Sequence, residues 1–155
     1  MSEIKAFIDG ASRGNPGEAG LGVVAISEKK RVEFYAYLGG ATNNWAEYCA
    51  LIAALLYAQA TKASSVAIYA DSELVVNQMK GFYRVKNQNL KILHKQALSV
   101  ANEFEKFEIN HIDREKNLRA DKLANIAINL QKSSLPAEIP FEKIPQWREK
   151  SPRLF

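Results

Sequence analysis

Alternation of apolar and polar side chains marks three short segments before residue 40, and the pattern then changes abruptly. Residues 4–9 and 31–38 alternate as strands with one buried face do, and residues 20–27 form an apolar, β-branched run. Lys29 and Lys30 separate the second segment from the third and form the expected turn. Short polar connections suit hairpins, so we expect three consecutive antiparallel strands.

The segment that follows, residues 43–61 (NNWAEYCALIAALLYAQAT), is apolar nearly all round and contains one charged residue, Glu47. This pattern predicts a helix that is buried on more than one side. The remaining predicted elements are strands at 66–71 and 107–113 and helices at 72–80, about 88–104 and 117–131. Because strands separated by helices pair in parallel, the sequence predicts an α/β fold with a mixed five-stranded sheet and flanking helices.

The C-terminal segment differs in composition from the rest of the chain. The whole chain, with 155 residues of which 47% are hydrophobic, suits one domain with one core. Four of the five prolines, however, fall within residues 133–155. Proline lacks a backbone N–H, so this segment should be neither a helix nor a central strand. We expect a domain at residues 1–132 and an extended tail at 133–155 that either wraps the domain or is mobile.

Two roles are open for the apolar residues of the tail. Four of them are expected to pack on the domain, because so many exposed apolar groups would be unusual: Ile139, Phe141, Ile144 and Trp147. The terminal pair Leu154 and Phe155 could instead dock a replication partner such as a sliding clamp, whose ligands often end in a similar apolar pair.

Charge and cysteine content narrow the class of protein. The net charge of +4 and pI near 9.1 are compatible with a polyanionic partner. Bases gather between Lys80 and Arg119, where residues 81–87 (GFYRVKN) interleave them with aromatic side chains. The single cysteine, Cys49, excludes an internal disulfide. The sequence shows no signal-peptide pattern, and its longest weakly charged stretch, residues 48–60, is too short to span a bilayer. We therefore expect a cytoplasmic protein without a membrane segment.

Four acidic residues stand at the ends of predicted elements or alone among apolar neighbours: Asp9, Glu47, Asp71 and Asp121. Each has a local explanation that involves no catalysis. Asp9 could bond turn amides, and Asp71 could cap the helix that follows it. Asn44 and Glu47 match a variant of the capping box, with Thr42 and Asn43 as further possible caps, and the helix macrodipole favours an acid at Asp121. No single carboxylate therefore decides the function.

As a set the four acids are more informative, because the elements that carry them can converge on one edge of the sheet. Ligands of such sheets bind beyond the carboxyl ends of the strands, where Asp71 would lie. Convergent carboxylates repel one another and call for divalent cations. With no Cys/His cluster for zinc, Mg²⁺ or Mn²⁺ is expected. Two such ions about 3.5–4 Å apart would polarise a phosphodiester, activate a water and stabilise the leaving oxygen.

Four ordered segments resemble the signature segments of type 1 ribonucleases H. They are residues 7–17 (FIDGASRGNPG), 42–48 (TNNWAEY), 69–72 (YADS) and 119–125 (RADKLAN), and each carries one of the four acids. The resemblance runs from about residue 4 to residue 130. It implies a sheet in the order 3-2-1-4-5 and endonucleolytic cleavage of the RNA strand of RNA/DNA hybrids, leaving 5′-phosphate and 3′-hydroxyl ends.

The resemblance also implies roles for individual residues. Asp9 would bridge both metal ions, Glu47 and Asp71 would hold one of them, and Asp121 the other. Glu47 would also contact the ribose 2′-hydroxyl, which distinguishes RNA from DNA. His111 stands where many relatives carry a mobile histidine that assists proton transfer or product release. A lone histidine is more often a surface or packing residue, and that alternative stays open.

Substrate contacts follow from the same resemblance, and the expected residues are Ser12, Asn15, Asn43, Asn44, Ser72, Arg84 and Lys86. The three asparagines match family positions that touch the backbone and minor-groove edges of the hybrid. The two serines are added as plausible neighbours.

The chain departs from the family pattern in two places. Glu73 stands where several relatives carry Gln, which could alter a substrate contact. The connection at residues 81–90 is too short for the extra basic helix and loop with which some relatives grip hybrids. Arg84, Lys86 and Tyr83 are expected to compensate in part through phosphate and stacking contacts. We therefore expect weaker and more salt-sensitive hybrid binding, with a preference for Mn²⁺ over Mg²⁺ as an open alternative.

Other functions remain open at this point. Another nuclease of the ribonuclease H-like superfamily, such as an integrase or exonuclease, would share the acids but not the four ordered segments. The nuclease domain of a reverse transcriptase would be joined to a polymerase, and the sequence carries no polymerase segment. A catalytically silent hybrid-binding module is expected to have lost an acid, whereas all four are present. Cleavage of double-stranded RNA is a further alternative.

Overall fold

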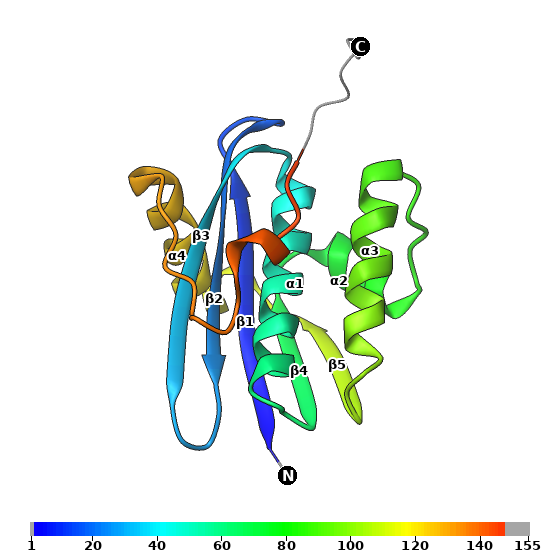
Figure 1. The fold of residues 1–155 in the computed structure, drawn as a ribbon. Helices are drawn as coiled ribbons and strands as arrows, with labels where there is room; N and C mark the ends of the chain where they lie inside the picture. The colour runs from blue at the N-terminus through cyan, green and yellow to red at the C-terminus, as the bar shows by residue number, and fades with distance from the viewer. Residues whose placement is uncertain (1, 148–155) are drawn as a thin grey trace.

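A five-stranded sheet forms the centre of the molecule, and helices cover both of its faces (Figure 1). The computed structural model describes residues 2–147. The elements in chain order are β1 (Glu3–Ser12), β2 (Gly17–Ile26), β3 (Arg31–Ala41), α1 (Asn43–Ala60), β4 (Ser65–Ala70), α2 (Glu73–Lys80), α3 (Gln88–Ala101), β5 (Lys106–His111), a 3-10 turn (Arg114–Lys116), α4 (Leu118–Leu130) and a second 3-10 turn (Phe141–Lys143). The strand order is β3-β2-β1-β4-β5, with β1 antiparallel to β2 and parallel to β4. This confirms the expected fold and strand order.

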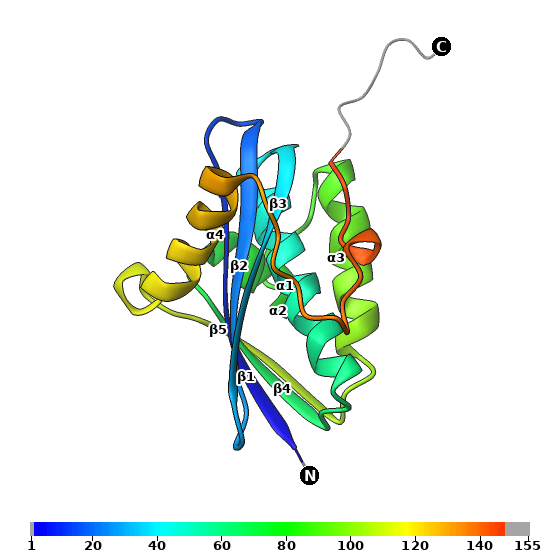
Figure 2. The ribbon, with the colours of Figure 1, turned by 60° about the vertical axis from the view of Figure 1, so that its left-hand side comes forward.

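The central strand β1 lies between helices on both faces of the sheet. α1 packs against β1 and β2 with α3 beside it, whereas α4 packs against β1, β2 and β3 from the other face (Figure 2). Because successive side chains of a strand point to opposite faces, β1 contributes to the layers on both sides. No helix among residues 2–147 is both long and apolar enough to cross a membrane.

The expected buried helix at 43–61 is confirmed as α1, and one of the three possible caps is selected. Thr42 is the N-cap, and its Oγ1 accepts a hydrogen bond from the backbone N–H of Trp45 at 3.2 Å. Asn44 and Glu47 both lie inside the helix, so the predicted capping box is wrong. The Glu47 carboxylate is directed to β1 instead, where it accepts a hydrogen bond from the backbone of Gly10.

After α4 the chain crosses the edge strand β3 and continues along the face that carries α1 (Figure 2). The backbone N–H of Ser134 donates to the carbonyl of Tyr35 at 2.9 Å, and the backbone N–H of Tyr37 donates to Ser133 Oγ at 3.0 Å. These bonds pair backbone groups that an open sheet edge would otherwise expose.

Part of the tail packs in the core. Ile139 is 2% exposed and Ile144 is 1% exposed, and the Trp147 ring meets the Trp45 ring edge-on at 5.2 Å. Phe141, which was also expected to pack, is 40% exposed. The proposed clamp-docking pair at 154–155 lies outside the described residues. The expected boundary between a domain at residues 1–132 and a tail at residues 133–155 stays a prediction.

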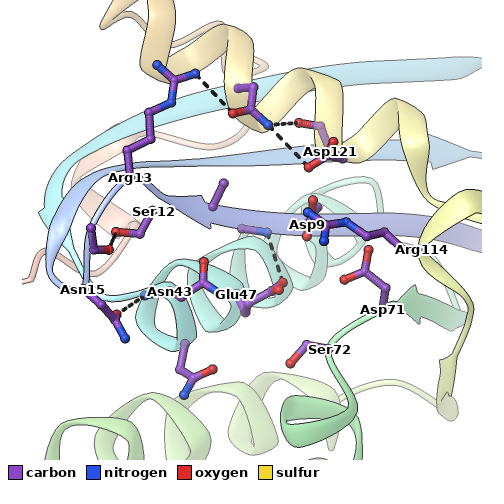
Figure 3. A pocket seen from close by; sticks show the side chains of 15 residues that line it. Asp9, Ser12, Arg13, Asn15, Asn43, Glu47, Asp71, Ser72, Arg114 and Asp121 are labelled. Carbon is purple, nitrogen blue, oxygen red and sulfur yellow. Dashed lines mark hydrogen bonds between the residues drawn. The ribbon is translucent and has the colours of Figure 1, made fainter.

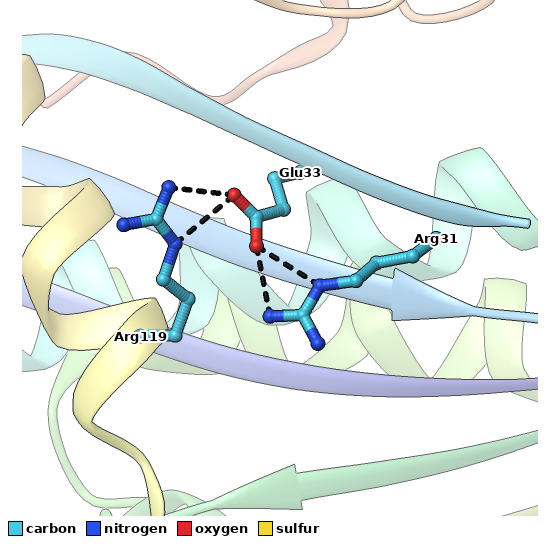
Figure 4. Close-up of polar contacts among 3 residues, drawn as sticks. All are labelled: Arg31, Glu33 and Arg119. Carbon is cyan, nitrogen blue, oxygen red and sulfur yellow. Dashed lines mark hydrogen bonds and ion pairs between the residues drawn. The ribbon is translucent and has the colours of Figure 1, made fainter.

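An ion pair joins α4 to the edge of the sheet (Figure 4). One oxygen of Glu33 accepts from Arg119 at 2.7 Å and the other from Arg31 at 2.8 Å. The Arg119 guanidinium, with Arg31 adding to it, lowers the pKa of the Glu33 carboxyl. Such partly exposed pairs add little stability. This one fixes the first turn of α4, in which Asp121 lies, against β3.

Burial of the tail predicts a difference between two of its apolar residues. Ile144→Ala should lower the free energy of unfolding by about 2–4 kcal/mol, because it leaves a cavity in the core. Phe141→Ala, at an exposed position of the same segment, should lower it by less than about 1 kcal/mol. Denaturant unfolding of both variants checks this, and equal small effects would show that the tail adds nothing to the core.

Candidate active site

Asp9 and Asp71 lie side by side at the carboxyl ends of two parallel strands. Ile8 of β1 is paired with Ala70 of β4, so the residues that follow them stand at the same level. Ligands of α/β sheets bind at this edge. Asp71 does not cap α2, because Ser72 has that role: its hydroxyl accepts a backbone N–H of the helix at 3.2 Å. The Asp71 carboxylate is therefore not used as a helix cap and can form a site together with the carboxylate of Asp9.

Glu47 is brought to the same edge by the close approach of α1 to β1. Its Oε1 accepts a hydrogen bond from the backbone N–H of Gly10 at 3.0 Å, and its side chain is buried. A Cβ at Gly10 would meet the carbonyl carbon of Ala46 at 2.3 Å, so a larger residue there would push the helix away. Gly10 therefore both admits α1 and orients the Glu47 carboxylate.

Asp121 reaches the site from the opposite face, in the first turn of α4. Asp9 is paired across the sheet with Gly22 of β2. A Cβ at Gly22 would meet the carbonyl oxygen of Ala120 at 2.3 Å, so the glycine lets α4 settle on the sheet. The result places Asp121 close enough to Asp9 to raise the pKa of the Asp9 carboxyl.

The acids form one cluster. Asp9, Glu47 and Asp71 each offer a carboxylate oxygen, and these oxygens all lie within 4.8 Å of one another. Burial, and then the charges of Asp71 and Asp121, raise the pKa of Asp9 to about 8. Burial and the charge of Asp9 raise the pKa of Glu47 well above its usual value. Oxygen donors whose mutual repulsion disfavours their charged forms fit a hard divalent cation such as Mg²⁺ or Mn²⁺.

Asn117, which the sequence analysis did not identify, holds Asp71 in place. Its Nδ2 donates to Asp71 Oδ2 at 3.1 Å and to the carbonyl of Ile8 at 2.7 Å, and the residue is 1% exposed. One amide thus ties the acid after β4 to the backbone of β1. Its position four residues before Asp121, on the same side of a predicted helix, was the available signal.

The cluster lies in an open cleft of about 740 Å³ (Figure 3). Of the expected site residues, the cleft is lined by Asp9, Ser12, Asn15, Asn43, Asn44, Glu47, Asp71, Ser72 and Asp121. Asn15 also ties its loop to the start of α1, because its Oδ1 accepts a hydrogen bond from the backbone N–H of Asn43 at 3.0 Å. The sequence analysis did not assign Arg13, Arg114 or Asn125, which line the cleft as well.

Three expected residues do not line this cleft: His111, Arg84 and Lys86. His111 ends β5 and is exposed. Three residues later, Arg114 lines the cleft instead, and its charge opposes the rise in the pKa of Glu47. Arg84 and Lys86 lie in the exposed connection between α2 and α3.

Comparison with known proteins gives a consistent result. Residues 7–127 match a family model described as reverse transcriptase-like. Ribonuclease HI of Halobacterium salinarum is 39% identical over 128 residues, which are 81% of this chain and 64% of the relative. A bifunctional protein of Mycobacterium tuberculosis is 40% identical over 144 residues, which are 88% of this chain. The match spans only 38% of that longer protein.

Solved structures agree in fold. The crystal structure of RNase H1 from Halobacterium salinarum superposes with a TM-score of 0.79 at 40% identity, covering 82% of this chain and 98% of the other. LC11-RNase H1 in complex with an RNA/DNA hybrid superposes with a TM-score of 0.77 at 43% identity, covering 83% and 98%. With the same fold and this identity over most of its length, the chain belongs to the type 1 ribonuclease H family.

Proposed function

We propose that this chain is an endoribonuclease that hydrolyses the RNA strand of RNA/DNA hybrids, leaving 5′-phosphate and 3′-hydroxyl ends. The observation that carries the proposal is the cluster of Asp9, Glu47 and Asp71, whose carboxylate oxygens lie within 4.8 Å of one another at the base of a cleft. Its membership of the ribonuclease H family supports the substrate, since its relative LC11-RNase H1 was solved with an RNA/DNA hybrid.

Asp9, Glu47, Asp71 and Asp121 would hold divalent cations. Two such ions, when bound, would polarise the phosphodiester, activate a water and stabilise the leaving oxygen. The protein contributes orientation: Gly10 fixes the carboxylate of Glu47, and a buried amide fixes that of Asp71. Side chains held in this way need little rearrangement when substrate arrives. Glu47 is also the proposed contact for the ribose 2′-hydroxyl.

Polar side chains around the cluster would contact the hybrid. Since Asn15 Oδ1 is already bonded to the backbone of Asn43, its amide N–H groups remain to donate to a phosphate oxygen. Ser72 accepts a hydrogen bond through its hydroxyl oxygen and can still donate one. Arg84 and Lys86, outside the cleft, would contact phosphates farther along the hybrid, with a strong salt dependence.

We also propose that Arg114, rather than His111, is the cationic side chain next to the reacting phosphate. Arg114 lines the cleft, and its charge lowers the pKa of Glu47. His111 is paired with Ala70, next to Asp71, but its side chain is exposed and is not among the residues that line the cleft. Arginine stays charged at any physiological pH, so its contribution would be electrostatic rather than proton transfer.

Asp71→Asn tests the proposed activity. Even residues that only support a metal site reduce activity by about 10–100-fold when changed, so loss of a ligand should reduce cleavage by more than about 100-fold. Cleavage of a labelled RNA/DNA hybrid with Mg²⁺ and with Mn²⁺ measures this. Asp113→Asn, the same change at an acid outside the cleft, is the control. Full activity of Asp71→Asn would refute the site.

The assignment of Arg114 predicts a second contrast. Arg114→Ala should lower kcat by about 10-fold or more, because it removes a charge beside the reacting phosphate. His111→Ala should change kcat by less than about threefold. Steady-state cleavage by the two variants decides between them, and the reverse order would restore the histidine to the catalytic role.

Removal of the Asp9 charge should stabilise the metal-free protein. The pKa of Asp9 is raised from 3.8 to about 8, so the folded state binds more protons than the unfolded state between these values. Stability without metal should therefore fall as the pH rises through this window. Asp9→Asn should raise the free energy of unfolding near neutral pH by about 1–2 kcal/mol, or roughly 2–8 °C in Tm.

Thermal unfolding in EDTA at about pH 5 and about pH 8 measures this effect. The gap in Tm between Asp9→Asn and the unmodified protein should be larger at the higher pH. A gap that narrows with rising pH would contradict the raised pKa. Activity of Asp9→Asn should be lost at both values.

A further inference from the structure

The loop between β1 and β2 holds Arg13 at the rim of the cleft. The backbone N–H of Arg13 donates to the carbonyl of Glu18 at 2.8 Å. The preceding residue, Ser12, donates its hydroxyl to the carbonyl of Ala41 at 2.7 Å, which ties the loop to the end of β3. The backbone from which the Arg13 side chain extends is therefore fixed on both sides of the hairpin.

The Arg13 side chain crosses to α4, which is distant in the sequence. Its Nη2 donates to Asn125 Oδ1 at 3.2 Å. The same amide donates through Nδ2 to Asp121 Oδ1 at 3.3 Å and to the Asp121 carbonyl at 3.0 Å. Because Arg13 can only donate, its bond selects the amide orientation in which the N–H groups of Asn125 face Asp121.

The positive charge of Arg13 at the cleft also makes this side chain a candidate anion-binding group. Among the described residues, Arg13 and Arg114 are the cations that line it; in Figure 3 Arg114 is drawn next to Asp9, whereas Arg13 stands away from the four acids, beside the β1–β2 loop. A guanidinium has N–H donors in a fork that matches two phosphate oxygens. Only one N–H group of Arg13 has a side-chain partner within residues 2–147. The others can bind an anion without releasing Asn125.

We propose that Arg13 binds a backbone phosphate of the hybrid next to the cleavage site, and that Asn125 is a positioning residue that couples this contact to Asp121. The proposal rests on the proposed function, because it takes the hybrid as the ligand of the cleft. Arg13 contributes directly to substrate affinity. Asn125 acts through its two partners, Arg13 and the carboxylate of Asp121.

Hybrid binding without cleavage tests the first part. Fluorescence anisotropy of a labelled RNA/DNA hybrid in EDTA, measured across a series of salt concentrations, gives both the affinity and its salt dependence. Arg13→Ala should weaken binding by about tenfold and reduce the slope of log K against log [salt] by about 1, because one phosphate contact is lost. Arg13→Lys should keep the slope, since it keeps the charge.

Lys29→Ala is the matched control, because it removes one positive charge in the β2–β3 turn at the other end of the sheet (Figure 1). An unchanged slope in Lys29→Ala with a reduced slope in Arg13→Ala supports the assignment. Equal slopes in the two variants overturn it. If the unmodified protein cleaves no hybrid with Mg²⁺ or Mn²⁺, the proposed function itself fails, and this outcome differs from failure of Arg13 alone.

Steady-state cleavage tests the positioning role of Asn125. Asn125→Ala should raise KM through Arg13 and lower kcat through Asp121, each by about 3- to 10-fold. In the Arg13→Ala background the same change should leave KM unaltered and still lower kcat. An equal rise in KM in both backgrounds would mean that Asn125 acts on binding without Arg13, and would overturn the coupling.

Discussion

Mutual repulsion among buried carboxylates is the constraint on which the rest of the structure depends. Asp9 is 5% exposed and Glu47 is 6% exposed, and their oxygens lie with that of Asp71 within 4.8 Å of one another. Unpaired charges in such surroundings are unfavourable, and the raised pKa values of Asp9 and Glu47 reflect this. Packing elsewhere in the fold must therefore hold the acids together.

That packing is supplied from both faces of the central strand. Gly10 admits α1 and Gly22 admits α4, because a side chain at either position would meet helix backbone at 2.3 Å. α1 is buried along most of its length, and the tail adds Ile139 and Ile144 to the same core. Repulsion among the acids thus destabilises one end of the sheet, while packing stabilises its middle. Functional sites commonly reduce stability in this way, and the rest of the fold offsets the loss.

The elements were predictable because each has a strong local pattern, as the alternation along β1 and β3 and the apolar run of α1 illustrate. Residue patterns alone predicted a mixed five-stranded sheet, whereas the strand order came from the family resemblance. Local pattern could not choose the cap of α1, since Thr42, Asn43 and Asn44 offer similar chemistry and only the backbone geometry selects Thr42. It likewise could not tell buried Ile144 from exposed Phe141 in the tail.

The supporting residues of the site were not predictable for a different reason. Asn117 acts on Asp71, and Arg13 on Asn125, across long separations in the sequence that only the folded chain closes. Arg114 lies in the cleft because a short 3-10 turn follows β5, whereas the histidine three residues earlier lies outside it. The family resemblance favoured His111, and its catalytic role stays a prediction.

We propose that these acids converge in order to bind divalent cations, and anomalous scattering from crystals grown with Mn²⁺ tests this proposal. The account predicts anomalous density in contact with the carboxylates of Asp9, Glu47 and Asp71. Crystals that show Mn²⁺ elsewhere on the protein but none at this cluster, with the carboxyl groups bonded only to one another, would contradict it.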